Sequence, residues 1–364
     1  MEKLLYLLLV LLISLPTSAI SQSKQIIKAL YIPLADHYAG LVAYERYHNK
    51  MQYADFQLKK MKSWDLLRAY FRSGKADMAY IMAPLAMDMY NESPNFRWIG
   101  LMHRDGNALA INEQLNFQVQ LPEQREKRKP DAKVAQALKN IYQQNHHTIE
   151  IALPHLLSTH GVVLYSYLKQ NGLSLDFDNN QNLEVSVLAI APPKSPSFLK
   201  SKSNRAQAAA FEQSLPWADV VETEHFGYIA WYSKDVLKWK NGHVECIVVA
   251  TDEAINSKYK ALYEVRSFIN RAAKDIENAR EKGGQELEKI VEIIRKHIPS
   301  HTRKAILASL DPVLKVINYQ KLNIDKAGLK QVMDLALEAG ILKKEVDIDQ
   351  FADTSFDILE KNYD

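Results

Sequence analysis

The chain has 364 residues, 46 of them Lys or Arg and 43 Asp or Glu, so its formal net charge is only +3. That charge is too small to indicate a nucleic-acid partner, and no nucleic-acid-binding motif is present. The length favours two domains over one, and a chain that is 47% hydrophobic has the composition of an ordinary globular protein.

The first 19 residues have the pattern of a secretory signal peptide. Lys3 supplies the positive end, residues 4–15 are almost wholly apolar, and small residues follow up to Ala19. The apolar run is shorter than a typical membrane span, and an uncleaved N-terminal anchor is the alternative. The sequence predicts cleavage near Ala19 and export to the periplasm. The only cysteine, Cys246, excludes an internal disulfide, and its apolar surroundings predict a buried thiol.

The next residues predict alternating strands and helices. Residues 26–32 are typical of a strand, which Pro33 ends, and residues 53–58 of a second strand. Residues 63–89 predict helix, strand and helix, with Ser63 as the first N-cap and Pro84 in the first turn of the second helix. Further strands are expected at 96–102 and 108–111. This alternation predicts a mostly parallel sheet flanked by helices.

The second half begins with a charge-rich stretch at residues 113–147, which we interpret as a crossover or insert. The elements expected after it are a strand at 148–153, a helix from Ser158, a strand at 183–190, a helix within 198–211, strands at 227–232 and 244–250, and then nearly continuous helix from 262 to 339. We therefore predict an α/β chain with two lobes: lobe I from 25–112 and 228–364, and lobe II from 148–227.

Several predicted helix starts carry side chains that suit a binding site. Backbone N–H groups at a helix start bind anions, and Ser158, Thr159 and His160 add polar side chains there. Simple N-capping by a hydroxyl uses the same N–H groups and is the alternative interpretation. Trp64 and Trp217 either pack in the core or line a crevice.

Catalytic and metal-binding patterns are missing from the sequence. There is no Gly-rich phosphate loop, no nucleophile elbow and no paired set of cysteine ligands. His146 and His147 are adjacent, so their side chains diverge and are not expected to share a metal. We therefore expect no enzyme activity, no cofactor and no metal.

The order and spacing of the motifs resemble the periplasmic solute-binding proteins of ABC importers for nitrate, bicarbonate, sulfonates and taurine, which include binders of thiamine precursors. The resemblance is carried by Tyr31–Leu34 with Asp36, by Ser63-Trp64 with Arg68, by 74–79 followed by Met82-Ala83-Pro84, by 106–108, by 158–160 and by 351–356. It covers nearly all of the chain after the signal peptide.

The resemblance implies a type II binding-protein fold with a helical C-terminal segment, whose two lobes close over a small solute. It implies ligand contacts from Pro33, Asp36, Ser63, Trp64, Met82, Ala83, Asn107, Ser158, Thr159, His160 and Trp217. The expected function is capture of a small anion or sulfonate-like solute by a monomer, which passes it to an ABC permease and its ATPase. The alternative is an exported module that presents its solute to a membrane sensor kinase.

One position departs from the family pattern. The nitrate and bicarbonate binders carry a Glu-Pro-Trp motif in the second lobe, whereas this chain has Leu215-Pro216-Trp217. Because a leucine side chain cannot bind a metal ion, a bicarbonate site that includes calcium is not expected here.

Overall fold

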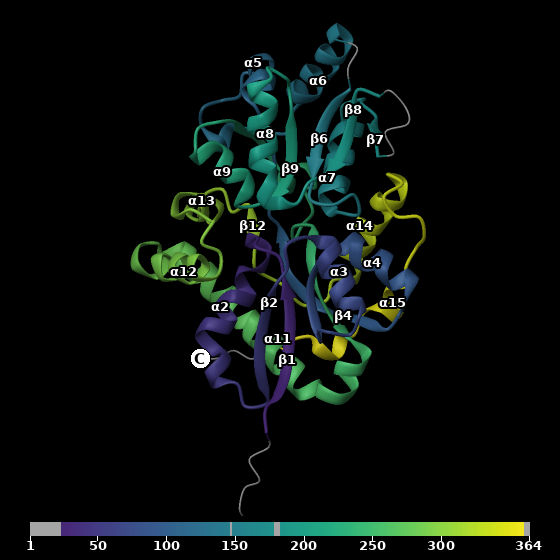
Figure 1. Cartoon of the computed structure of the whole chain (residues 1–364), viewed down its shortest axis with the longest axis vertical. Helices are drawn as coiled ribbons and strands as arrows, with labels where there is room; N and C mark the ends of the chain where they lie inside the picture. Colours follow the sequence, from purple (N-terminus) through teal and green to yellow (C-terminus); the bar gives the residue numbers. More distant parts are fainter. Residues whose placement is uncertain (1–22, 146–147, 178–182, 360–364) are drawn as a thin grey trace, which may run out of the picture.

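The computed structural model describes residues 23–145, 148–177 and 183–359. The predicted signal peptide and the His146-His147 pair lie outside these residues. Within them, two six-stranded sheets form two lobes, one above the other in Figure 1. No helix of the described residues is long and apolar enough to span a bilayer.

The sheet of lobe I has the strand order β12-β4-β11-β3-β1-β2. Its strands are β1 (Gln25–Tyr31), β2 (Ala54–Lys60), β3 (Met78–Met82), β4 (Phe96–Asp105), β11 (Val244–Thr251) and β12 (Ile317–Asn318). The sheet of lobe II has the order β10-β5-β9-β6-β8-β7. Its strands are β5 (Asn107–Ile111), β6 (Ile149–Leu153), β7 (Leu175–Asp176), β8 (Val185–Ala189), β9 (Ala210–Ser214) and β10 (Tyr228–Tyr232).

Helices cover both sheets, which confirms the predicted α/β class. They are α2 (Tyr38–Tyr47), α3 (Trp64–Arg72), α4 (Ala83–Glu92), α5 (Glu113–Val119), α6 (Ala132–Asn145), α7 (Thr159–Gln170), α8 (Ser195–Asn204), α9 (Trp217–Thr223), α10 (Ser233–Val236), α11 (Asp252–Lys282), α12 (Gly284–His297), α13 (Arg303–Ser309), α14 (Lys326–Glu338) and α15 (Ile348–Phe351).

The sheets are mixed, which differs from the mostly parallel sheets predicted. Strands β1, β2 and β3 pair in parallel in lobe I, and β6, β7, β8 and β9 do so in lobe II. The strands next to the lobe boundary, β4, β5, β10 and β11, pair antiparallel. These four carry the chain between lobes, and a strand that enters a sheet from the opposite lobe runs against its neighbours.

The two crossings define where the lobes meet. Strand β4 leads through Gly106 directly into β5, and β10 leads through α10 back to β11. Sheet membership therefore places residues 107–112 and 228–232 with lobe II, and α5 and α6 pack in the same core as β6 and β9. We therefore propose two lobes as expected, but with the chain crossing between them at Gly106 and at residues 233–243.

The helix expected within residues 198–211 was wrong at its C-terminal end. Helix α8 ends at Asn204, Ala206 takes a positive φ of 54°, and β9 begins at Ala210. The alanine-rich composition favoured a helix, but β9 lies between β5 and β6, where cross-strand pairing outweighs local propensity.

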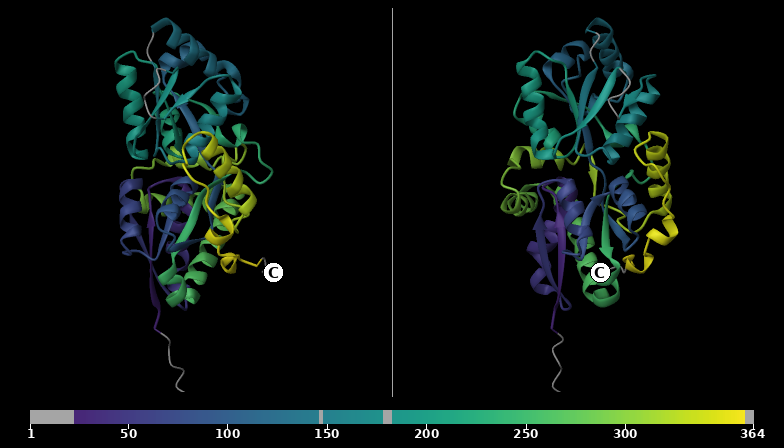
Figure 2. Two further views of the ribbon diagram at one scale, coloured as in Figure 1. Left: turned by 90° about the vertical axis from the view of Figure 1, so that its right-hand side faces the viewer. Right: turned by 45° about the vertical axis from the view of Figure 1, so that its right-hand side comes forward.

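The C-terminal helices bridge the lobes. Helix α14 contacts α4 of lobe I and α7 of lobe II, and α13 packs on α9. Figure 2 shows this C-terminal segment, in yellow, alongside both lobes. One core of buried residues extends from lobe I into lobe II and includes Val162, Phe211 and Leu215. The structure is therefore a closed arrangement, with little solvent between the lobes.

Candidate functional site

A group of buried polar side chains lies where the two lobes meet. The group, called here the inter-lobe cluster, consists of Asp36, His103 and Glu245 from lobe I, and Asn107, Thr159, His160, Glu212 and Ser214 from lobe II. All eight side chains are fully buried. Because burial of polar groups costs free energy unless they are paired, such a concentration in one place indicates a functional site.

Asp36 is joined to lobe II through Ser214. It follows β1 in a short 3-10 turn, Ala35–His37, and its Oδ2 accepts a hydrogen bond from Ser214 Oγ at 2.9 Å. Ser214 Oγ in turn lies 3.0 Å from His160 Nε2. His103 Nε2 lies 3.6 Å from the same carboxylate. Burial opposes the charge on Asp36, but the surrounding histidines, His103 foremost, outweigh it and lower the pKa of Asp36.

The start of α7 supplies Thr159 and His160, as the sequence predicted. Ser158 is the N-cap of this helix, since its Oγ accepts a hydrogen bond from Gly161 N at 3.2 Å. Capping therefore occupies the Ser158 hydroxyl, whereas Thr159 Oγ1 has no hydrogen-bond partner. Burial lowers the pKa of His160 to about 3, so its imidazole is neutral.

Glu245 lies at the centre of the cluster and is held by histidines alone. His160 Nδ1 is 3.5 Å from its Oε1, and His243 Nδ1 is 3.6 Å from its Oε2. Asn107 and Thr159 face the same carboxyl group, although neither reaches it with hydrogen-bonding geometry. Burial, together with Asp36 and Glu212, raises the pKa of Glu245 well above its usual range.

Glu212 is the second carboxyl group without a partner. Glu212 and Ser214 are two residues apart in β9, so their side chains point to the same face of the strand. Neither of its oxygens has a hydrogen-bond partner, and burial raises the pKa of Glu212 well above its usual range, with a contribution from Asp36.

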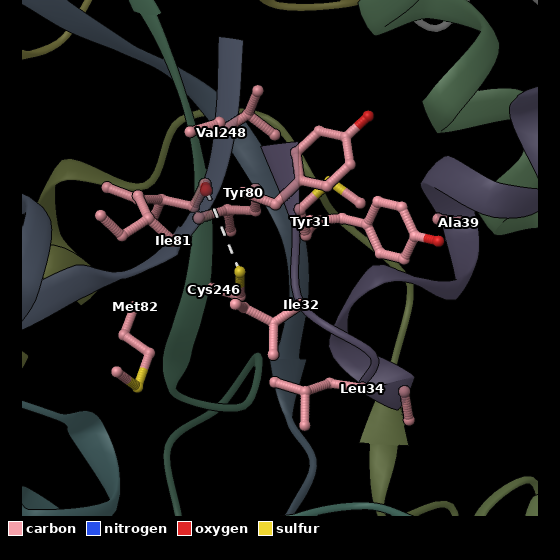
Figure 3. Close-up of a cluster of buried hydrophobic side chains, with 14 of the residues drawn as sticks. Tyr31, Ile32, Leu34, Ala39, Tyr80, Ile81, Met82, Cys246 and Val248 are labelled. Atoms are coloured by element: carbon pink, nitrogen blue, oxygen red, sulfur yellow. Dashed lines mark hydrogen bonds between the residues drawn. The ribbon is translucent and has the colours of Figure 1, made fainter. Parts of the chain in front are cut away.

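The other predicted residues surround the cluster in different roles. Pro33 and Trp217 bind each other, because Trp217 Nε1 donates a hydrogen bond to the Pro33 carbonyl oxygen at 3.0 Å. Met82 and Ala83 are buried where β3 meets α4. Met82 pairs across the sheet with Cys246, the residue after Glu245, and both lie in the apolar wall drawn in Figure 3.

Ser63 and Trp64 stand at the start of α3. Ser63 is the N-cap, accepting a hydrogen bond from Leu66 N at 3.2 Å, and remains partly exposed. Trp64 is buried, packs edge-on to His37 at 6.0 Å between ring centroids, and has no hydrogen-bond partner for its Nε1. Trp64 therefore contacts His37, the residue after Asp36, and Ser63 caps helix α3.

Sequence reasoning missed His103, Glu212, Ser214 and Glu245. A signal was present for Glu245, because it interrupts the apolar strand Val244–Thr251, whereas Glu212 lies beside the polar residues Gln213 and Ser214 and gave none. A charged residue in a strand that is buried throughout is rare unless it has a partner or a function. Cys246 was predicted correctly, since its thiol is fully buried.

A separate cavity of about 720 Å³ lies on the surface of lobe I near the crossing and is lined by Arg104, Tyr319 and Asp325, among others. None of the predicted ligand-binding residues lines it. The cavity is open to solvent, and its buried cation, Arg104, already forms an ion pair with Asp325 at 2.9 Å. The inter-lobe cluster is therefore the stronger candidate site.

Comparison with known proteins gives the class. The chain belongs to the NMT1-like family, whose model matches residues 22–291, and this confirms the family resemblance seen in the motifs. No match was found among curated proteins.

Solved structures share the fold over nearly the whole chain. The zinc-bound ligand-binding component of an ABC-type import system from Staphylococcus aureus is 19% identical, with a TM-score of 0.70 over 92% of this chain and 98% of that one. The periplasmic nitrate-binding protein NrtA from Synechocystis PCC 6803 is 15% identical, with a TM-score of 0.71 over 92% and 88%. The alkanesulfonate-binding protein SsuA from Xanthomonas axonopodis pv. citri, bound to MOPS, is 10% identical, with a TM-score of 0.65 over 91% and 99%.

Proposed function

We propose that this chain is the periplasmic solute-binding component of an ABC importer. It captures a small solute between its two lobes and delivers it to a membrane permease and its ATPase. The observation that carries the proposal is the inter-lobe cluster: both lobes contribute buried polar side chains, and many of these lack a partner within the protein.

The lobes supply the means of capture. Asp36 and Glu245 reach the site from lobe I, and Thr159, His160 and Glu212 from lobe II. A solute that contacts both sets is held only when the lobes close, and closure excludes the water that would compete for the same groups. Release to a permease then requires the lobes to open.

The known ligands of solved structures with this fold agree with such a role. Those proteins are named as binding nitrate or alkanesulfonate, or as a zinc-bound import component. The motif order of this chain favours a small anion or a sulfonate-like solute, whereas its buried carboxyl groups favour the opposite charge. The screen must therefore contain solutes of both signs.

A thermal-shift screen of the mature protein tests the proposal. A solute that binds only the folded protein, at about one hundred times its Kd, should raise the melting temperature by about 5 °C. The panel comprises nitrate, nitrite, taurine, alkanesulfonates, phosphonates, thiamine precursors, divalent metals and organic amines. If no solute changes the melting temperature, capture of these solute classes is excluded.

Delivery to a permease needs a cellular test. Deletion of the gene should abolish uptake of the solute found in the screen, and restoring the wild-type gene should restore uptake. A variant with the lobe contact weakened, Trp217→Phe, should restore it only in part. Unchanged uptake in the deletion strain would favour presentation of the solute to a sensor over import.

A further inference from the structure

The inter-lobe cluster has a definite sign of charge. It contains three carboxyl groups, those of Asp36, Glu212 and Glu245, each fully buried. In the described part of the chain, the only basic side chains within 4.0 Å of the Asp36 and Glu245 carboxyl groups are histidines, and Glu212 has none that close. No Lys or Arg among the residues that the structure describes forms an ion pair with these carboxyl groups. Burial raises the pKa of Glu212 and Glu245, so both keep a proton while the site is empty. A cation that replaces these protons would meet three carboxylates with no competing positive side chain.

The carboxyl oxygens are the largest set of atoms left without partners in the cluster, beside the possible donors Asn107 Nδ2 and Thr159 Oγ1. Among the described residues, Asp36 Oδ1, both oxygens of Glu212 and both oxygens of Glu245 lack a hydrogen-bond donor. Leaving a buried acceptor unpaired costs about 1–3 kcal/mol, and more where the group is charged. Five such atoms in one site indicate that another molecule supplies the missing donors or positive charge.

An anion fits this arrangement poorly. It would meet the charged carboxylate of Asp36 inside the protein, where like charges repel strongly, and it would gain nothing from the loss of the protons on Glu212 and Glu245. At the helix start that was expected to receive an anion, the Gly161 N–H is already taken by Ser158 Oγ. The neutral His160 imidazole adds a lone pair at Nδ1, which has no hydrogen-bond partner.

We propose that the solute recognised by this site is positively charged, and that Asp36, Glu212 and Glu245 hold its charge. The inference rests on the proposed function, since it takes the inter-lobe cluster as the solute site. Two sources share this chemistry: a divalent metal ion and an organic ammonium compound.

The donor set is compatible with both sources. Carboxylate oxygens and imidazole nitrogens bind divalent metals of the first transition row, and carboxylates also pair with ammonium groups. Among the described residues, no three His, Cys, Asp or Glu side chains already converge as a metal site. A metal ion would have to draw these side chains together, whereas an ammonium group would bind acceptors that remain further apart.

Titration calorimetry and thermal shifts on the mature, EDTA-treated protein test the charge of the solute. The probes are zinc chloride, choline, ethanolamine and spermidine as cations, and sodium nitrate and taurine as anions. We expect one cationic probe to bind with a stoichiometry of one and to raise the melting temperature by about 5 °C. A rise with zinc that EDTA reverses identifies a metal ion; a rise with an amine in the presence of EDTA identifies an organic ammonium compound.

The double variant Glu212→Gln/Glu245→Gln locates the site. Burial raises the pKa of both groups well above the usual range, so glutamine imitates the protonated side chains of the empty protein and the variant should fold. Its affinity for the cation should fall at least about tenfold, because two charge-assisted contacts are lost. Glu288→Gln, an exposed glutamate paired with Arg303 on the surface, is the matched control and should bind as the wild type does.

Each remaining outcome overturns the inference. If nitrate or taurine binds and no cation does, the receptor function stands and the charge assignment fails. If a cation binds equally well to the double variant, it binds elsewhere. If no probe of either sign binds, the cation inference fails, and the uptake of solutes by the deletion strain then decides the receptor function separately.

Discussion

At the scale of single residues, the chain keeps several histidines neutral inside the protein. His301 is an example outside the inter-lobe cluster: its Nε2 lies 3.1 Å from the Pro33 carbonyl oxygen and its Nδ1 lies 2.9 Å from the Tyr38 hydroxyl. Burial lowers the pKa of His301 to about 3. The imidazole therefore gives its one proton to Pro33 and accepts a hydrogen bond from Tyr38.

This pKa has a consequence for stability against pH. Between pH 6.5 and about 3 the unfolded chain binds a proton at His301 that the folded chain does not, so stability falls as the pH falls below 6.5. Between pH 7 and pH 5 the loss from this one group is up to about 2 kcal/mol. His301→Gln should therefore lose less stability than the wild type over that range.

Urea unfolding at pH 7, 6 and 5 measures the difference. His297→Gln is the control, because His297 lies partly exposed beside Glu45, outside the lobe contact. Equal pH slopes for His301→Gln and the wild type would contradict the assignment of a neutral, buried imidazole.

At the scale of elements, strand β4 depends on a glycine. Gly100 has a φ of +147°, and a Cβ atom there would overlap the guanidinium group of Arg266 from α11. Arg266 is fully buried and donates to the carbonyl oxygens of Ile99 and Leu322. The glycine thus allows α11 to fix β4 in the lobe I sheet, where β4 lies between the edge strand β12 and β11.

Gly100→Ala should lower the free energy of unfolding by about 3 kcal/mol or more, since a buried arginine cannot move without losing its hydrogen bonds. Gly172→Ala is the matched control: it has a φ of +71° and no atom within 4 Å of its added Cβ, so it should cost only about 1 kcal/mol. Urea midpoints of the two variants give the comparison, and equal losses would show that Arg266 gives way.

At the scale of the whole molecule, hydrogen bonds between the lobes add to the shared core and the bridging helices α13 and α14. Ala35 N donates to the Leu215 carbonyl oxygen at 2.8 Å, and Trp217 Nε1 donates to the Pro33 carbonyl oxygen. Each net hydrogen bond contributes about 1 kcal/mol. The balance between open and closed lobes is therefore within reach of one substitution.

Trp217→Phe should populate open lobes, because it removes the hydrogen bond to Pro33 and keeps most of the aromatic packing. The radius of gyration from X-ray scattering should increase, and the Kd for the solute should rise about fivefold as the closed state becomes less populated. Trp98→Phe is the control, since Trp98 Nε1 donates to the Gly100 carbonyl oxygen within lobe I. Opening in both variants, or in neither, would show that Trp217 does not govern closure.

The sequence by itself determined the class of the fold and part of the site. Periodicity and caps placed the starts of α3 and α7, where Ser63 and Ser158 act as N-caps. The motifs around Asp36, Asn107 and His160 pointed to the family and to residues that do lie in the inter-lobe cluster. Such signals are local, because capping and hydrophobic alternation act over a few residues.

Only the tertiary structure decided which side chains meet and which charge they present. Asp36, Glu212 and Glu245 are more than thirty residues apart along the chain, so nothing local shows that they share a site without a lysine or arginine. The same holds for Ala210 and Phe211, which were expected in a helix and which lie in β9 because that strand pairs with β5 and β6. Long-range strand pairing and burial decide both the grouping of these carboxyl groups and the start of β9. Neither effect produces a periodic pattern of residues that the sequence alone would show.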